Sequence, residues 1–213
     1  MMKHTRIAVL VSGGGTNLQA LIDAQQRGEL GGGEITAVIS SSEGAYALER
    51  AARAGIAGYV VPRKVYSSNR EMTVAVVEKL KALDIELVVL AGCMVIFTRE
   101  LTEAYPNAIM NVHPALIPSF CGEGYYGLHV HEKALEYGVK LSGATVHFVT
   151  EECDGGPIIA QQAVPVLEGD TPETLQKRIM EQAEWKLLPK AVALFCQGRL
   201  SVAGRTVVIK QEV

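Results

Sequence analysis

An asparagine and a histidine stand two residues apart where a short apolar segment ends, in the sequence Met110-Asn-Val-His-Pro114. Because side chains alternate along an extended backbone, Asn111 and His113 are expected on the same side of it. An amide donor beside an imidazole suits the stabilisation of an oxyanion together with the movement of a proton. Considered alone, a structural histidine beside a loop asparagine explains this motif at least as well.

An aspartate lies in the loop Cys153–Pro157, between two predicted strands. Asp154 could face a ligand, although an Asx turn is the better explanation of this loop considered alone. If its carboxylate lies beside His113, the negative charge favours imidazolium. We then expect the pKa of His113 to lie above its ordinary value of about 6.5.

A glycine-rich loop, Ser12-Gly-Gly-Gly-Thr-Asn17, follows the first apolar segment. Glycines let backbone N–H groups approach an anion closely, and a helix N-terminus favours negative charge. The loop matches neither the dinucleotide pattern G-x-G-x-x-G nor the triphosphate pattern G-x-x-x-x-G-K-[ST]. A single phosphate monoester fits it better, with a tight turn and an ordinary helix cap as the alternative.

The remaining histidines and the cysteines show no metal-binding pattern. His129 and His131 are two apart on a predicted helix and therefore do not share a face, and His4 and His147 have no ligand-like neighbours. The four cysteines lie far apart without a C-x-x-C pair. We expect reduced thiols, a cytoplasmic location and no metal.

Strand-like and helix-like segments alternate through the first half of the chain, which predicts right-handed βαβ units and a parallel sheet covered on both faces. Ligands bind beyond the carboxyl ends of such strands, which directs attention to four loops: 12–17, 91–97, 111–127 and 151–157. The predicted strands are 6–11, 34–40, 58–61, 87–90, 108–112, 141–150, 158–166 and 205–210, and the predicted helices are one after residue 15, 45–54, one from a Ser68 capping box through Leu83, 129–137 and 171–198.

The second half adds mixed strands and a long helix, in which Pro189 is predicted to cause a kink or a division. No repeat or linker is evident, so we expect residues 1–213 to form a single domain. With 48% hydrophobic residues and a net charge of −3, the chain is neither disordered nor basic enough for a broad nucleic-acid surface. Its longest apolar run, 87–97, is too short to span a membrane.

Four segments together resemble the phosphoribosylglycinamide formyltransferase family, and the resemblance covers nearly the whole chain. They are S-G-G-G-T-N-L-Q from residue 12, A-G-C-M from 91, M-N-V-H-P from 110 and V-H-F-V-T-E-E-C-D-G-G-P-I-I from 146. N-x-H-P with a distant D-G-G-P is shared by the wider formyltransferase group, whereas G-T-N-L-Q points to the ribonucleotide branch. The resemblance implies a Rossmann-like α/β fold, a mostly parallel central sheet with helices on both faces and a mixed C-terminal half.

The same resemblance implies transfer of a formyl group from the co-substrate 10-formyltetrahydrofolate to the glycyl amine of phosphoribosylglycinamide, without a metal. It implies small-molecule substrates, and neither a nucleic acid nor a membrane as partner. The implied roles are catalytic for Asn111, His113 and Asp154, substrate-binding for Gly15, Thr16, Asn17 and Glu184, and folate-binding for Arg70, Met94, Val95, Ile96, Phe97 and Asn111.

The chain departs from the family pattern at three places. Val95 stands where arginine is frequent, Trp185 stands where histidine is common, and the loop 119–127 is longer than usual. Two alternatives remain: another folate-dependent formyltransferase or a formyltetrahydrofolate hydrolase, and a non-catalytic phosphometabolite-binding module. We expect neither the added C-terminal domain of methionyl-tRNA formyltransferases nor the N-terminal regulatory domain of the hydrolases. The complete Asn, His and Asp set counts against the binding module.

Overall fold

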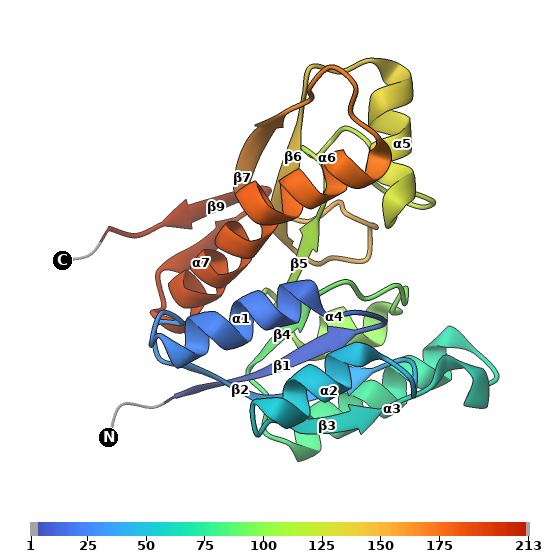
Figure 1. Ribbon diagram of the computed structural model, residues 1–213. Helices are drawn as coiled ribbons and strands as arrows, with labels where there is room; N and C mark the ends of the chain where they lie inside the picture. Colours follow the sequence, from blue (N-terminus) through green and yellow to red (C-terminus); the bar gives the residue numbers. More distant parts are fainter. Residues whose placement is uncertain (1–3, 212–213) are drawn as a thin grey trace.

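The structure, a computed structural model, describes residues 4–211 and contains one nine-stranded sheet with helices on both faces (Figure 1). Its strands are β1 (Thr5–Val11), β2 (Gly33–Ser40), β3 (Ala57–Val60), β4 (Leu87–Leu90), β5 (Ile109–His113), β6 (Leu141–Phe148), β7 (Ile158–Pro165), β8 (Leu200–Ala203) and β9 (Thr206–Ile209). Its helices are α1 (Thr16–Gln26), α2 (Tyr46–Arg53), the 3₁₀ turn η1 (Arg63–Val65), α3 (Asn69–Ala82), α4 (Arg99–Ala104), α5 (Leu128–Tyr137), α6 (Pro172–Ile179), the π-helical η2 (Met180–Glu184) and α7 (Trp185–Cys196).

The strand order is β3-β2-β1-β4-β5-β6-β7-β9-β8, and the first five strands in that order are parallel. Strands β6 and β7 continue the sheet in antiparallel pairing, and the β8–β9 hairpin closes its far edge. The predicted fold class, a mostly parallel sheet with a mixed C-terminal half, is therefore confirmed.

Strand β1 shows why the parallel strands have continuous apolar sequences. Ile7, Val9 and Val11 belong to the core that contains α1, α2, α6 and α7, whereas Ala8 and Leu10 belong to the core beneath α3 and α4. All five side chains are buried. A strand covered on both faces needs apolar residues at every position, which is what this segment provides.

The loops after β1 and β4 meet at the carboxyl edge of the sheet, where the strand order reverses. The Ser12 N–H donates to the Gly92 carbonyl at 3.2 Å, and the Met94 N–H donates to Ser12 Oγ at 2.9 Å. Ligands bind at such switch points in open α/β sheets. The fold thus places two of the four predicted ligand loops side by side.

Some local predictions were incomplete. Helix α4 and strand β8 were not predicted, because six and four residues are too few to show a period. Ser68 caps α3 as predicted, through its Oγ and the Glu71 N–H, but the Glu71 carboxylate accepts from Ser67 rather than completing the capping box on Ser68.

The predicted break at Pro189 was wrong in position. The long helix is interrupted by η2, and Pro189 lies within α7 as its fifth residue. A proline has no N–H for the carbonyl four residues earlier, which here belongs to Trp185 at the start of α7. The lost hydrogen bond therefore falls at the junction with η2, and α7 continues past the proline.

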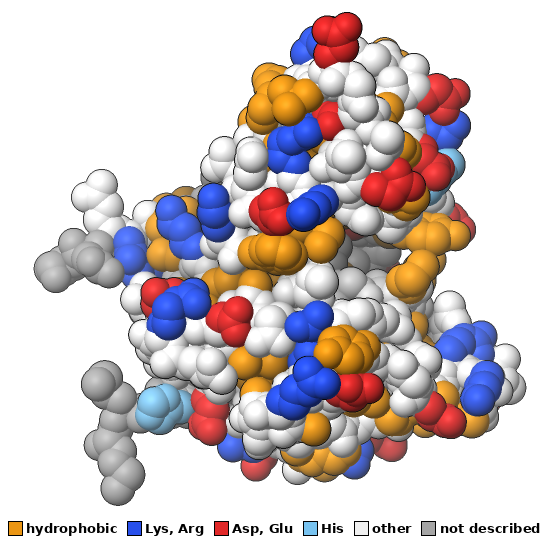
Figure 2. All heavy atoms as spheres, viewed as in Figure 1, with side chains coloured by type: hydrophobic (Ala, Val, Ile, Leu, Met, Phe, Trp, Pro, Cys, Tyr) orange, Lys and Arg blue, Asp and Glu red, His pale blue; other side chains and the backbone are white. Residues whose placement is uncertain are grey.

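Acidic and basic side chains are interspersed over the face of the molecule shown in Figure 2. No helix within residues 4–211 combines the length and the apolar character that a membrane crossing requires.

Candidate active site

The polar groups of the candidate catalytic cluster lie on, or directly after, the adjacent antiparallel strands β5 and β6. Strand β5 carries Asn111 and His113, and β6 leads into the loop that carries Asp154. In the β5–β6 register, Asn111 lies opposite His147. Asp154 has a φ of 53°, a left-handed conformation that aspartate tolerates better than most residues and that turns its side chain back toward β5.

The Asp154 carboxylate is the centre of this cluster. Its Oδ2 lies 3.4 Å from His113 Nδ1 and accepts a hydrogen bond from the Gly122 N–H at 2.9 Å. Its Oδ1 accepts from Asn111 Nδ2 at 3.4 Å and lies 3.5 Å from His147 Nε2. The structure thus brings Asn111, His113 and Asp154 together.

His113 is almost fully buried, and both of its ring nitrogens face oxygen atoms. Its Nε2–H donates to the Phe120 carbonyl at 2.8 Å, and its Nδ1 faces Asp154. Burial lowers the pKa of His113 below its ordinary value, and the charge of Asp154 acts in the opposite direction without reversing the result. The expected net rise of the His113 pKa was therefore wrong, because burial outweighs the carboxylate.

The pKa of Asp154 reflects the same competition with the opposite outcome. Burial acts to raise it, but the hydrogen bond with His147, the proximity of His113 and the Gly122 N–H together hold the pKa below its ordinary value. Asp154 is therefore a carboxylate at neutral pH, and its negative charge faces both histidines.

His147 was missed by sequence reasoning. Its Nδ1–H donates to the Phe148 carbonyl at 2.8 Å, and its Nε2 lies 3.3 Å from Asn111 Nδ2 and 3.5 Å from Asp154 Oδ1. The amide nitrogen of Asn111 is thus held between His147 and Asp154. The signal that could have found His147 is the strand pairing across β5 and β6, which a single sequence does not show.

The long loop 119–127 contacts the cluster through two backbone groups. Phe120, with a φ of 50°, supplies the carbonyl that His113 contacts, and Gly122 supplies the N–H that Asp154 contacts. The segment in which this chain departs from the family pattern is therefore part of the wall around both residues.

The predicted phosphate loop and Glu184 converge at the start of α1. Gly15 precedes α1 with a φ of 71°, and the Asn17 Nδ2 donates to Glu184 Oε2 at 2.6 Å. Asn17 Oδ1 is buried without a hydrogen-bond partner within residues 4–211. Burial raises the pKa of Glu184 to about 7, although the Asn17 hydrogen bond acts to lower it. Two segments 167 residues apart thus share one polar site.

The predicted folate segment leaves β4 at the same edge of the sheet. Met94 and Ile96 are exposed, at 63% and 57%, whereas Val95 and Phe97 pack against the core beneath α3 and α4. Alternate side chains of this segment therefore point toward solvent, where a flat apolar ligand can contact them.

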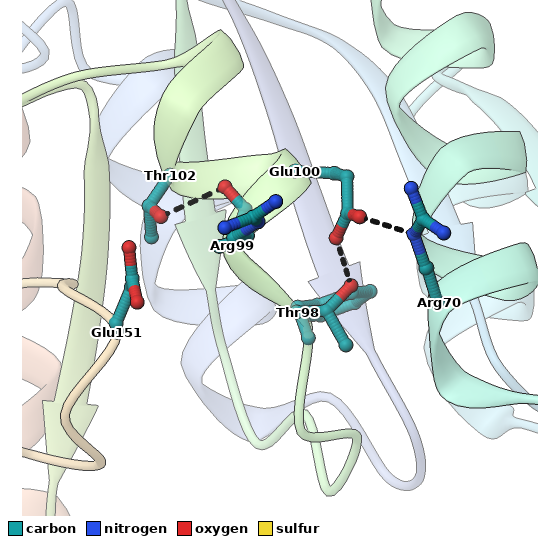
Figure 3. A pocket seen from close by; sticks show the side chains of 7 residues that line it. Arg70, Thr98, Arg99, Glu100, Thr102 and Glu151 are labelled. Carbon is teal, nitrogen blue, oxygen red and sulfur yellow. Dashed lines mark hydrogen bonds and ion pairs between the residues drawn. The ribbon is translucent and has the colours of Figure 1, made fainter.

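Arg70 borders an open cavity of about 520 Å³ between α3, α4 and the loop after β6. Its Nε donates to Glu100 Oε1 at 2.5 Å, and Figure 3 shows Glu100 reaching from α4 toward it, with Glu151 at the other side of the cavity. Hydrogen bonds from Thr98 and then Arg70 lower the pKa of Glu100 to about 2. The cavity thus has charged walls, and Phe97 is also part of its lining.

No group of three or more histidine, cysteine, aspartate or glutamate side chains with a metal-binding arrangement occurs in the described part of the chain, residues 4–211.

The chain is similar to known formyltransferases in sequence and in structure. A family model described as formyl transferase matches residues 5–192. A phosphoribosylglycinamide formyltransferase of Haemophilus influenzae is 43% identical over 195 residues, which is 92% of this chain and 89% of that protein. Glycinamide ribonucleotide transformylase 1 of Symbiobacterium toebii has a TM-score of 0.92 and 46% identity, covering 98% of this chain and 95% of that one.

A formyltetrahydrofolate deformylase of Pseudomonas syringae has a similar fold, with a TM-score of 0.87, but is only 28% identical and is covered over 67% of its length. The fold is thus common to both activities, whereas higher identity over almost whole chains accompanies the transferases. On that similarity, the chain belongs to the phosphoribosylglycinamide formyltransferase family, enzymes that transfer a formyl group in purine biosynthesis.

Proposed function

We propose that the formyl donor is 10-formyltetrahydrofolate, that the acceptor is the glycyl amine of phosphoribosylglycinamide, and that Asn111, His113 and Asp154 carry out the transfer. The observation that supports these roles best is the single carboxylate of Asp154 in contact with both other side chains. Both substrates are small molecules, and we propose neither a nucleic acid nor a membrane as partner.

The proposed reaction begins when the neutral amine attacks the formyl carbon, giving a tetrahedral intermediate with a cationic nitrogen and an oxyanion. Asn111 Nδ2 donates to that oxyanion. Its present contacts, at 3.3 and 3.4 Å, are long enough to be exchanged for a shorter one. An oxyanion donor of this kind typically contributes about 2.7–4 kcal/mol to transition-state stabilisation.

His113 is proposed to move the proton. Because burial lowers its pKa, the ring is uncharged in the resting enzyme and can accept the proton of the cationic amine. The resulting imidazolium lies beside Asp154 and then donates the proton to N10 of the folate as the carbon–nitrogen bond breaks. The proton released by the amine is thus the one that the leaving group takes up.

The remaining residues are proposed to bind the two substrates. Gly15, Thr16 and Asn17 face the phosphate with the positive end of α1, and Glu184 contacts the ribonucleotide beside Asn17. Met94, Val95, Ile96 and Phe97, with Asn111, contact the folate, and Arg70 lies on the folate side at the cavity of Figure 3. We also propose residues 1–213 as a single formyltransferase domain, supported by one sheet that runs from Thr5 to Ile209.

The test is the absorbance change of 10-formyltetrahydrofolate with and without phosphoribosylglycinamide. A transferase deformylates the folate only when the amine acceptor is present. Deformylation without acceptor would instead indicate the hydrolase, whose fold is similar. Binding of the ribonucleotide without any deformylation would indicate a phosphometabolite-binding module.

A further inference from the structure

Helix α2 holds the glycine-rich loop from outside the proposed phosphate site. The Ala47 N–H donates to the Gly13 carbonyl at 3.1 Å, and Arg50 Nε donates to the Gly14 carbonyl at 2.8 Å. A Cβ on Gly15 would lie 2.7 Å from the Cβ of Ala47, so the loop and α2 are in close contact. Figure 1 shows α1 and α2 on the same side of the sheet.

These two hydrogen bonds fix the direction of the loop's N–H groups. In a planar trans peptide, the carbonyl and the following N–H point in opposite directions. Because the carbonyls of Gly13 and Gly14 point toward α2, the N–H groups of Gly14 and Gly15 point away from it. Within residues 4–211, neither of these N–H groups donates a hydrogen bond. They extend the row of unpartnered N–H groups at the start of α1, an arrangement that binds anions.

We propose that Arg50 is a positioning residue for the substrate phosphate, which it serves by holding the Gly14 carbonyl and by adding positive charge beside the loop. The proposal rests on the proposed function. Arg50 also donates through Nη1 to Gln19 Oε1 at 3.0 Å, so its guanidinium joins the loop to α1. The group lies 5.0 Å from the centre of the Tyr46 ring, which restricts its orientation.

Arg53 provides a matched control on the same helix. It lies over the same Tyr46 ring, at 5.4 Å, and pairs with Glu49 at 3.2 Å. Its hydrogen bonds are to Tyr46 and Glu49, both on α2, and not to the glycine-rich loop. Replacing Arg53 therefore removes an equal charge from α2 without removing a bond to the loop.

The test compares steady-state kinetics of Arg50→Ala, Arg50→Lys and Arg53→Ala. For Arg50→Ala we expect the KM for the ribonucleotide acceptor to rise about tenfold or more, with kcat and the KM for the folate donor each within about threefold of wild type. Arg50→Lys keeps the charge without the two-armed geometry and recovers part of the loss. Arg53→Ala leaves all three parameters unchanged.

A second acceptor separates positioning of the phosphate from support of the fold. For the same glycinamide ribonucleoside without its phosphate, the ratio of kcat/KM between wild type and Arg50→Ala falls to within about twofold. A similar loss for both acceptors, or equal rises in the KM values for donor and acceptor, would show a structural role and overturn the proposal. If Arg50→Ala does not fold, Arg50→Lys carries the same comparison.

Failure of the proposed function gives a different result. A wild-type protein that never transfers formyl refutes that function whatever Arg50 does. Calorimetric titration with inorganic phosphate then still decides the role of Arg50, since weaker phosphate binding by Arg50→Lys than by Arg53→Ala supports it. Equal phosphate binding by the two variants overturns it.

Discussion

Glu184, the last residue of η2, is an ionisable residue in the core and is only 5% exposed. Its carboxyl group contacts Asn17 of α1. Burial raises its pKa to about 7, although Asn17 donates to it. Glu184→Gln keeps the size of the side chain and an oxygen that can accept from Asn17, and it removes the charge. The variant therefore isolates the effect of ionising a buried acid on the stability of the fold.

Proton linkage gives the sign and the size of the expected change in the free energy of unfolding with pH. The folded protein binds this proton more tightly than the unfolded chain, so between pH 4.5 and about 7 it holds more protons and its free energy of unfolding falls as pH rises. Raising the pKa from 4.5 to about 7 corresponds to about 3 kcal/mol, since one pKa unit equals about 1.4 kcal/mol. Wild type loses this contribution to its free energy of unfolding as pH rises from 4.5 to about 7, and Glu184→Gln does not.

Urea denaturation of both proteins from about pH 5 to about pH 8 measures the effect, and we expect the difference in unfolding free energy to shift by about 3 kcal/mol in favour of the variant over that range. Glu181→Gln is the control, because Glu181 lies on the same segment but is exposed. Its curve should run parallel to that of wild type. Parallel curves for Glu184→Gln as well would refute the reasoning, because they would mean that Glu184 titrates as it does in the unfolded chain.

Three further predictions concern the rest of the site. Asn111→Ala should lower kcat about 10²–10³-fold in a variant that melts near the wild-type temperature, and a near-normal kcat would exclude Asn111 from the mechanism. Asp154→Asn should lower the pKa of His113 further, as followed by NMR titration of the ring. Because the pKa of buried His113 lies below 6.5, the unfolded chain takes up this proton at a higher pH than the folded protein does. The free energy of unfolding therefore falls as pH falls below 6.5, and it falls further in the variant. Gly15→Ala should lower the free energy of unfolding by about 1–3 kcal/mol, because its Cβ would meet Ala47 and its φ is 71°, and an unchanged melting curve would contradict this packing.

The parts of the fold that could be predicted are those determined by residues close together in the sequence. The apolar run of β1, the glycines after it and the Thr171 cap of α6 each specify local structure within a few positions. Alternation along β5 placed Asn111 and His113 together for the same reason. Sequence reasoning therefore located the edge of the sheet and most of the elements that carry the site.

The parts that could not be predicted depend on contacts between distant segments. The register that places His147 against Asn111, and the loop conformation that brings Phe120 to His113, arise from tertiary packing. The net direction of the His113 pKa also depends on burial, which is a property of the whole fold. Asn17 and Glu184 were related in the sequence only through the family resemblance, because nothing local joins them.

The π-helical segment η2 also changes which residues of the long helix face the core on either side of it. Leu175, Ile179 and Ala183 form one buried line at four-residue spacing, and Leu188 and Val192 continue it from Glu184 rather than from Ala183. An α-helix turns about 100° per residue, so this slip of one position rotates all of α7 relative to α6. Both Glu184 and the apolar face of α7 can point inward only because of that slip. The length of segment 180–184 is therefore constrained more strictly than the identity of its exposed residues.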